Sequence, residues 1–499
     1  MKILDCTLRD GGYYTHWDFD RELVESYLSS MKSLPVDYIE IGYRSVPQKN
    51  YEGEYCFLPE ATMQFCRLHF PDKKIAVMVN AKDVDEQTVS GLVKPCRGYV
   101  DMIRLAVKPT DIPAAVRVAG AVKKLGFEVA FNIMYMSLWD AISGFYDQLR
   151  LLRGKVDAVW LVDSFGSVTP EQVRVTIPQV KQATGCAVGF HGHQNLEMAF
   201  VNTLAAIESG CDFVDCTVTG MGRGAGNLKT ELLLTHVSRQ KHVDFVALLG
   251  VVEKFDELRQ KYNWGVSLPY MISGEYSLPQ KDIMAWMSKR RYNVETIVQT
   301  LQNGNKKVEA EFAKLDAITA DRILIIGGGK SVKQHLNAIL AYIEKFAASI
   351  VVVFSSSKHL SLFDCLPDGV RRFVCLVGNE GGRLEKQGSS VRQSDVFIIN
   401  QCGGALTTYV PQFVHGQVRS IAKGDGYPYC DSPLFIALNA FEGMKDVELV
   451  GFDGYDNAGG DYELMQENQN IIDSDKRQIV TLLPSKYQNL KPLSIYSLV

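Results

Sequence analysis

The chain of 499 residues is longer than one hydrophobic core normally supports, so we expect at least two domains. With 46% hydrophobic and 22% charged residues, its composition is that of a globular protein and excludes a largely disordered chain. The formal net charge of -4 lacks the basic footprint of nucleic-acid-binding proteins, so no nucleic-acid partner is predicted.

The N-terminus and the cysteines both favour a cytoplasmic location. Met1–Asp5 reaches an acidic residue too early for a signal peptide, and no apolar run approaches ~18 residues, so no membrane association is predicted. The 11 cysteines form no CxxC pair and lie in apolar surroundings. We therefore expect reduced thiols and no disulfide framework.

From the N-terminus to about residue 220, short apolar runs alternate with amphipathic stretches. The predicted strands cover residues 3–6, 38–42, 75–80, 102–106, 129–133, 159–163, 187–191 and 213–218. Helical periodicity lies between them, as in residues 21–31, 114–125, 171–184 and 196–209. Strand–helix units in this number and length predict an N-terminal (β/α)8 TIM barrel.

The sequence pattern after the predicted barrel indicates two further parts, one helical and one α/β. Residues 244–315 carry mainly helical patterns and are interpreted as a helical appendage or lid on a barrel domain of residues 1–243. Residues 316–499 return to alternating strands and helices, with strands expected at 322–326, 349–354, 373–377, 395–400 and 447–451. This pattern predicts a smaller C-terminal Rossmann-like α/β domain.

Polar residues stand where the predicted barrel strands end. Arg9 and Asp10 follow the first strand, and His191 and His193 close the seventh on one face of the backbone. Parallel barrels gather reactive groups at the carboxyl ends of their strands, so these side chains are expected to meet. One carboxylate and two imidazoles suit a divalent metal with open coordination positions. Arg9 would add a fixed positive charge for an enolate.

Other strand ends supply further candidates. Glu40 and Arg44 follow the second strand, Asn132 ends the fifth and Ser164 follows the sixth. We interpret Asn132, Ser164 and Arg44 as substrate-binding candidates, and Glu40 as the group that holds Arg9 or a metal-bound water in place.

Four motifs resemble the DRE-TIM metallolyase (HMG-CoA lyase-like) family, and most closely its 4-hydroxy-2-oxovalerate aldolase branch. They are TLRDG at 7–11, IEIG at 39–42, HGHQN at 191–195 and GMGRGAGN at 220–227. The resemblance implies a divalent metal, Mn2+ or Mg2+, held by Asp10, His191 and His193, with Asn227 as an extra ligand or loop anchor. It also implies that Arg9 neutralises an enolate oxygen of a 2-oxo acid while a carbon–carbon bond to an aldehyde is made or broken.

One position departs from the aldolase pattern. The aldolases carry a histidine three residues after the aspartate as general acid/base, and Tyr13 stands at that place here. Tyr13, Tyr14 and His16 are the candidates to replace it, although an ordinary phenol is a poor base at neutral pH. Because the histidine is missing, a non-catalytic metal-binding scaffold stays an alternative.

The C-terminal glycine run, Gly327–Ser331, supports neither a P-loop nor a dinucleotide fingerprint, because Leu324 and Val332 stand where small residues are required. NAD is therefore not expected. Lys330 and Ser331 at a helix start still suit a phosphate or nucleotide. A faint similarity to sialyltransferase-like domains gives one alternative, a bifunctional surface-polysaccharide enzyme that binds a nucleotide-sugar. Another is condensation of an acyl-CoA with a 2-oxo acid. A homo-oligomer is left open.

Overall fold

The structure is a computed structural model that describes residues 1–499 except 49–50, 289–290, 306–311, 319, 387–389, 401–407, 422–429, 445 and 456–459. It divides into two compact units, Met1–Lys281 and Asp282–Val499. The helical region predicted to begin near residue 244 thus contributes to both units, and the boundaries near residues 243 and 315 stay predictions.

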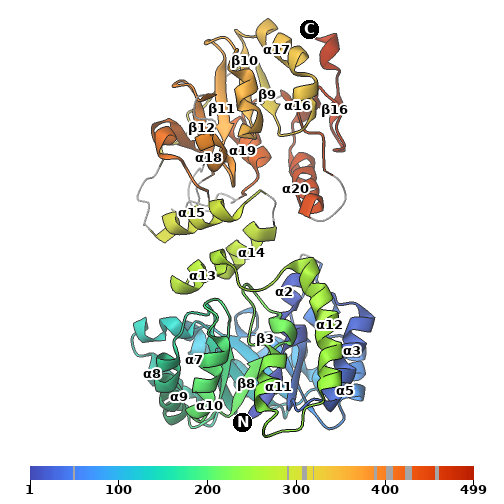
Figure 1. The fold of residues 1–499 in the computed structure, drawn as a ribbon, viewed down its shortest axis with the longest axis vertical. Coiled ribbons are helices and arrows are strands. Elements are labelled where there is room, and N and C mark those ends of the chain that lie inside the picture. Colours follow the sequence, from blue (N-terminus) through green and yellow to red (C-terminus); the bar gives the residue numbers. More distant parts are fainter. Residues whose placement is uncertain are drawn as a thin grey trace. The chain divides into compact units, whose positions relative to one another are not determined.

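The first unit is a closed barrel of eight parallel strands, in the order β1 to β8, which confirms the predicted TIM barrel (Figure 1). Each predicted strand is present within a few residues of its expected ends. The strands are β1 (Lys2–Asp5), β2 (Tyr38–Tyr43), β3 (Lys74–Asn80), β4 (Met102–Val107), β5 (Glu128–Ile133), β6 (Ala158–Asp163), β7 (Ala187–Gly192) and β8 (Phe213–Cys216).

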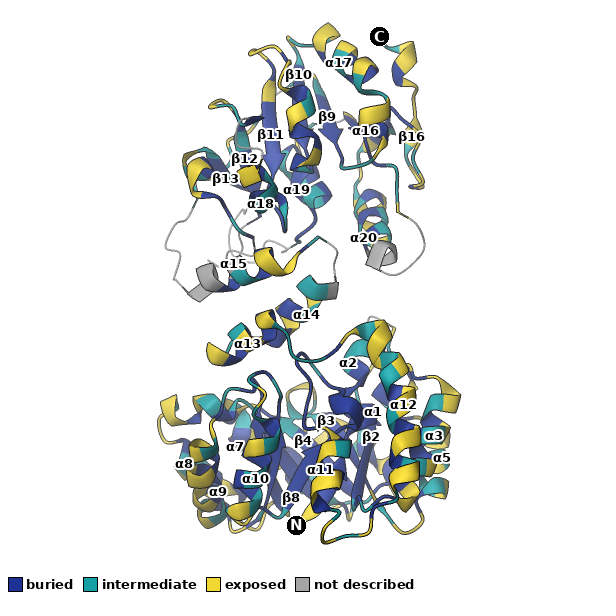
Figure 2. Ribbon diagram, in the orientation of Figure 1, coloured by how far each residue is buried: buried dark blue, intermediate teal, exposed yellow. Residues whose placement is uncertain are grey.

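Amphipathic helices cover the barrel, with buried faces toward the strands and exposed faces outward (Figure 2). They include α3 (Arg21–Ser33), α5 (Glu60–His69), α6 (Glu86–Val93), α7 (Ile112–Lys123), α9 (Pro170–Thr184), α10 (Ala199–Glu208), α11 (Thr230–Val237) and α12 (Phe245–Tyr262). Local sequence fixes their ends: the Asp20 carboxylate accepts from the first amides of α3, and a capping box of Thr169 and Gln172 begins α9. Helix α12 buries Leu248, Val251 and Phe255 in the same core as the strands.

Inside the barrel, one layer is charged instead of apolar. Glu40, Arg104, Trp160 and Asp215 come from β2, β4, β6 and β8, the alternate-strand arrangement that builds layers in such barrels. Arg104 donates to Glu40 at 3.1 Å and to Asp215 at 2.7 Å, and its guanidinium lies 4.4 Å from the centre of the Trp160 ring. Each member has at least one partner in the layer, which offsets the cost of burying these charges, although the second Glu40 oxygen is buried without a partner.

The second unit is built on a parallel sheet in the order β13-β12-β11-β10-β9-β14-β15-β16, which confirms the expected Rossmann-like class. Its strands are β9 (Arg322–Ile326), β10 (Ile350–Phe354), β11 (Arg371–Cys375), β12 (Val396–Ile399), β13 (Val418–Ser420), β14 (Asp446–Val450), β15 (Gln478–Thr481) and β16 (Lys491–Pro492). Its helices include α15 (Val294–Asn305), α16 (Ser331–Gln334), α17 (Leu336–Lys345), α18 (Glu380–Lys386), α19 (Pro433–Ala440) and α20 (Gly460–Ser474).

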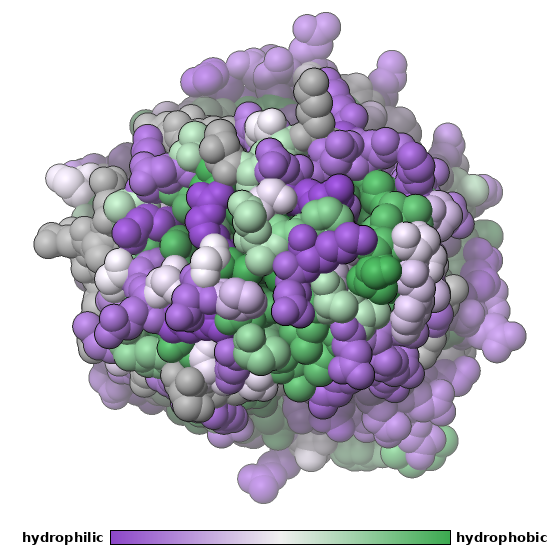
Figure 3. Space-filling view, turned by 90° about the horizontal axis from the view of Figure 1, so that it is seen from above, coloured by the Kyte–Doolittle hydropathy of each residue, from purple (hydrophilic) through white to green (hydrophobic). Residues whose placement is uncertain are grey.

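Among the described residues, no helix combines the length and apolar character needed to cross a membrane. In the surface view of Figure 3, apolar side chains gather in patches that hydrophilic ones surround and interrupt.

Candidate metal centre and active site

A cavity lies at the carboxyl ends of the barrel strands. Every strand, or the segment that follows it, contributes to the lining: Arg9, Asp10, Tyr13, Tyr43, Met78, Ala106, Asn132, Met134, Val162, Ser164, His191, His193 and Arg223. The short helix α1 (Thr7–Asp10), directly after β1, places Arg9 and Asp10 at this end of the barrel.

Asp10, His191 and His193 converge as the strand pattern predicted. The Oδ2 atom of Asp10 lies 3.8 Å from Nε2 of His191 and 4.0 Å from Nε2 of His193. All three side chains are buried, and one ligand atom from each lies within 4.8 Å of the others. One carboxylate oxygen and two ring nitrogens at this spacing fit a single cation.

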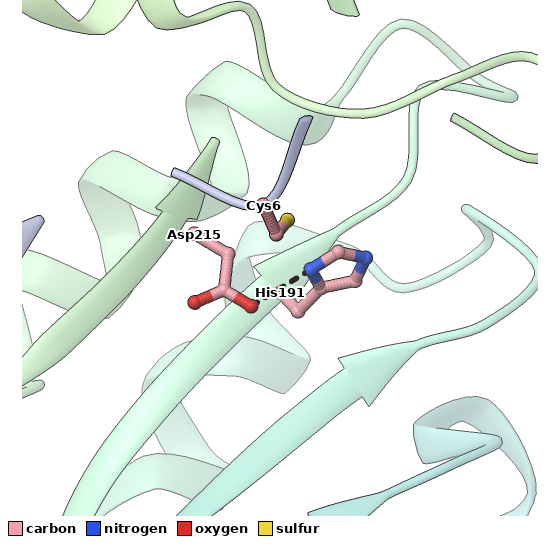
Figure 4. Close-up of side chains that lie close together, drawn as sticks. All are labelled: Cys6, His191 and Asp215. Carbon is pink, nitrogen blue, oxygen red and sulfur yellow. Dashed lines mark hydrogen bonds and ion pairs between the residues drawn. The ribbon is translucent and has the colours of Figure 1, made fainter. Parts of the chain in front are cut away.

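The atoms behind each imidazole determine which nitrogen is free. His191 Nδ1 lies 2.9 Å from the Asp215 carboxylate, an interaction marked by the dashed line in Figure 4. His193 Nδ1 lies 2.8 Å from the Asp163 carbonyl oxygen. Each Nδ1 therefore carries the proton, and each Nε2 presents a lone pair toward Asp10. Burial lowers the pKa of His193 to about 3, so its imidazole is neutral near pH 7. The residues present thus fit a divalent metal.

A second group, Cys6, His191 and Asp215, also lies close together (Figure 4). It offers a poorer ligand set, because Trp160 and Arg104 already donate to the Asp215 carboxylate at 2.7 Å each. Burial also raises the pKa of the Cys6 thiol well above its ordinary value, so the sulfur keeps its proton. We interpret this group as the support of His191.

Arg9 is held on two sides. Its Nε donates to Glu40 at 2.7 Å, and its Nη1 donates to Asp10. Burial opposes the charge on Asp10, but the Arg9 guanidinium and a hydrogen bond from Asn227 outweigh it and hold the pKa of the Asp10 carboxyl below its ordinary value. Through Glu40, Arg104 and Asp215, buried hydrogen bonds connect Arg9 to His191.

The glycine loop after β8 closes against the metal ligands. Asn227 Nδ2 donates to Asp10 Oδ2, so Asn227 anchors the loop at that carboxylate. A Cβ atom on Gly222 would lie 2.3 Å from Asn227 Nδ2 and 2.8 Å from Asp10 Oδ2. Only glycine allows this close approach.

Tyr13, Asn132 and Ser164 reach the same cavity. The hydroxyl of Tyr13 lies 3.2 Å from that of Tyr43, and burial raises the pKa of Tyr43 well above its ordinary value. Asn132 accepts from Arg104 at 3.0 Å, and Ser164 accepts from the Tyr135 amide at 2.8 Å.

Two predicted site residues lie elsewhere. The His16 side chain is 72% exposed, and its Nδ1 lies 3.4 Å from Glu52. Arg44 donates to the backbone carbonyls of Phe57, Leu58 and Leu92 and therefore ties together loops outside the cavity lining. An arginine at a strand end satisfies carbonyl groups as readily as it binds a substrate, and the sequence does not separate the two.

Sequence reasoning missed Arg104, Asp215, Tyr43 and Arg223. Arg104 and Asp215 interrupt the apolar runs MIRLAV and FVDC, and a charge inside a buried strand is itself a signal of a partnered interior site. Arg223 lies in the glycine loop at 220–227, where the sequence analysis considered the glycines and Asn227 and not the arginine.

Comparison with known proteins shows which family the chain belongs to. Residues 1–256 match the HMGL-like family, so the chain belongs to that family. An oxaloacetate decarboxylase from Mycobacterium tuberculosis is 29% identical over 49% of this chain and 72% of its own. A 4-hydroxy-2-oxovalerate aldolase from Geobacillus thermodenitrificans is 30% identical over 50% of this chain and 74% of its own length. A crystal structure described as "the N-terminal domain of a putative aldolase from Bacteroides vulgatus" is 45% identical, with a TM-score of 0.57, and covers 60% of this chain and 99% of that one.

In the second unit, Asp453 occupies the start of α16. Its carboxylate accepts from the Ser331 amide at 3.0 Å and from the Ser331 hydroxyl. The Asp453 carboxylate occupies the Ser331 amide and would repel a phosphate that approached the same N–H group. A nucleotide or nucleotide-sugar site in this unit stays a prediction.

Proposed function

We propose that the chain is a divalent-metal-dependent lyase that makes or breaks a carbon–carbon bond through the pyruvate-type enolate of a 2-oxo acid, with an aldehyde as the second substrate. The observation that carries this proposal is the convergence of Asp10, His191 and His193 with Arg9 on one cavity. The names of the relatives support it, since retro-aldol cleavage of 4-hydroxy-2-oxovalerate and decarboxylation of oxaloacetate both leave the enolate of pyruvate.

A divalent cation, Mn2+ or Mg2+, held by Asp10, His191 and His193 would supply a Lewis acid for the oxygens of the 2-oxo acid. Arg9 is fixed by Glu40 and Asp10, so its guanidinium meets the developing negative charge without reorganisation. Asn132 and Ser164 offer polar groups of the same cavity to the substrate.

Tyr13 is the proposed proton carrier, because it stands in place of the missing histidine and lines the cavity. The hydroxyl of Tyr43, whose raised pKa keeps it protonated, lies 3.2 Å from the Tyr13 oxygen and can donate to it. Such a hydrogen bond would stabilise Tyr13 as the phenolate, the form that takes the proton of the 4-hydroxyl group and becomes the neutral phenol.

Exchange of the methyl protons of pyruvate in D2O tests the enolate step alone. With Mn2+ or Mg2+ the wild-type protein should exchange them, and chelation or Arg9→Ala should abolish the exchange. Arg117→Ala is the matched control, because Arg117 lies on the surface, 65% exposed, beside Glu86. Absence of metal-dependent exchange in the wild type would contradict the proposal and favour a non-catalytic scaffold.

A further inference from the structure

Arg223 is the charged residue of the cavity that the proposed reaction does not use. Arg9 pairs with Asp10 and Glu40, and Arg104 pairs with Glu40 and Asp215. In the part of the chain that the structure describes, the Arg223 guanidinium makes no hydrogen bond or ion pair, and its Nε is buried without a partner. A buried donor of this kind is costly unless a ligand or water satisfies it.

The position of Arg223 is fixed by its neighbours on both sides. Gly222 packs against Asn227 and Asp10, and the carbonyl of Gly224 accepts from the Tyr14 hydroxyl at 2.8 Å. A loop pinned before and after Arg223 fixes the backbone from which the side chain extends, and Arg223 is a lining residue of the cavity. Its positive charge therefore faces the substrate space.

Arg223 also lies beside the proposed proton carrier, with its guanidinium 5.5 Å from the centre of the Tyr13 ring. The group of the substrate that Tyr13 deprotonates is the hydroxyl that becomes the aldehyde. A substituent on that carbon, on the Tyr13 side of the cavity, would meet Arg223.

We infer that Arg223 binds an anionic group, a carboxylate or a phosphate, on the aldehyde portion of the substrate. This inference rests on the proposed function and names the class of its second substrate. Arginine suits this role because its planar fork binds both oxyanions in bidentate fashion.

Binding of two unreactive probes tests the inference without turnover. Calorimetry should show that wild-type protein with Mn2+ binds 2-oxoglutarate about tenfold or more tightly than 2-oxopentanoate, which has the same length but lacks the distal carboxylate. Arg223→Ala should remove the difference, Arg223→Lys should restore part of it, and Arg117→Ala should leave it unchanged. Equal affinities for the two probes in the wild type would overturn the inference for a carboxylate, and the turnover experiment below decides it for a phosphate.

Measurements of turnover distinguish a carboxylate from a phosphate, and distinguish failure of the Arg223 inference from failure of the proposed lyase activity. The addition of pyruvate to a charged aldehyde, glyoxylate or glyceraldehyde 3-phosphate, is compared with its addition to an uncharged one, acetaldehyde or glyceraldehyde. The exchange of the methyl protons of pyruvate is measured on the same preparations. The wild-type protein should prefer one of the two charged aldehydes, and that preference identifies the anion. Arg223→Ala should reduce the preference by about 10- to 100-fold, and should reduce methyl exchange by less. Exchange without any such preference would refute the Arg223 subsite alone. Loss of exchange in the wild type would instead refute the lyase proposal.

Discussion

At the scale of single residues, the two imidazoles depend on the groups behind them. His191 Nδ1 faces Asp215 and His193 Nδ1 faces a backbone carbonyl, so side-chain substitution can release only the first. A carboxylate behind a histidine fixes the ring and increases its basicity as a ligand. The orientation of His191 is therefore open to a direct test.

Asp215→Asn should weaken Mn2+ binding by about 10- to 100-fold, measured by calorimetry, because the carboxylate that orients His191 is lost. Trp160→Phe is the comparison variant, since it removes the bond to the other Asp215 oxygen and leaves the bond between Asp215 and His191 in place. An unchanged affinity in Asp215→Asn, with normal binding in the control, would show that Asp215 does not support the metal site.

Tyr13→Phe should lower aldol cleavage by about 100-fold or more, because the proton carrier is lost while the metal ligands stay in place. Cleavage of a 4-hydroxy-2-oxo acid and Mn2+ affinity are measured on the same preparation. His16→Ala is the comparison variant, because His16 lies exposed and outside the cavity lining. If His16→Ala loses cleavage and Tyr13→Phe keeps it, the assignment to Tyr13 is wrong.

Residue types at strand ends were enough to predict the convergence of Asp10, His191 and His193, because parallel strands end at one rim. They were not enough for Arg44 or His16, whose direction is set by loop backbone that periodicity does not describe. Arg223 could not be predicted, since its lack of a partner is a property of the folded site alone.

At the scale of elements, the glycine loop after β8 places Asn227 against Asp10 and Arg223 in the cavity lining. Its glycines were recognised from the sequence, but the contact that requires Gly222 joins residues far apart in the chain. The helix start expected at Lys330 and Ser331 is present, but α16 ends at Gln334 and a second helix, α17, begins after His335.

Gly222→Ala should weaken Mn2+ binding, because the added methyl group would push Asn227 or Asp10 away. Overpacking costs about 1–3 kcal/mol, which corresponds to roughly 5- to 150-fold in affinity. Gly250→Ala, in α12 with nothing within 4 Å of the added atom, should bind Mn2+ normally and unfold at an equal or higher temperature. Normal Mn2+ affinity in Gly222→Ala would contradict this account of the loop.

At the scale of the whole molecule, the core clusters of the barrel contain only residues of the first unit. A chain ending at Lys281 should therefore unfold cooperatively on heating and keep the Mn2+ affinity of the full-length protein. Circular dichroism and calorimetry test this. A truncated chain with barrel helicity but no cooperative transition would show that the second unit is required for a native core.

The binding of Mn2+, followed by electron paramagnetic resonance of the free ion, tests the metal site most directly. We predict one saturable site per chain in the wild type, strong weakening in Asp10→Asn and His193→Ala, and no change in His242→Ala, whose side chain is exposed. Absence of binding in the wild type, or wild-type affinity in both Asp10→Asn and His193→Ala, would contradict the account.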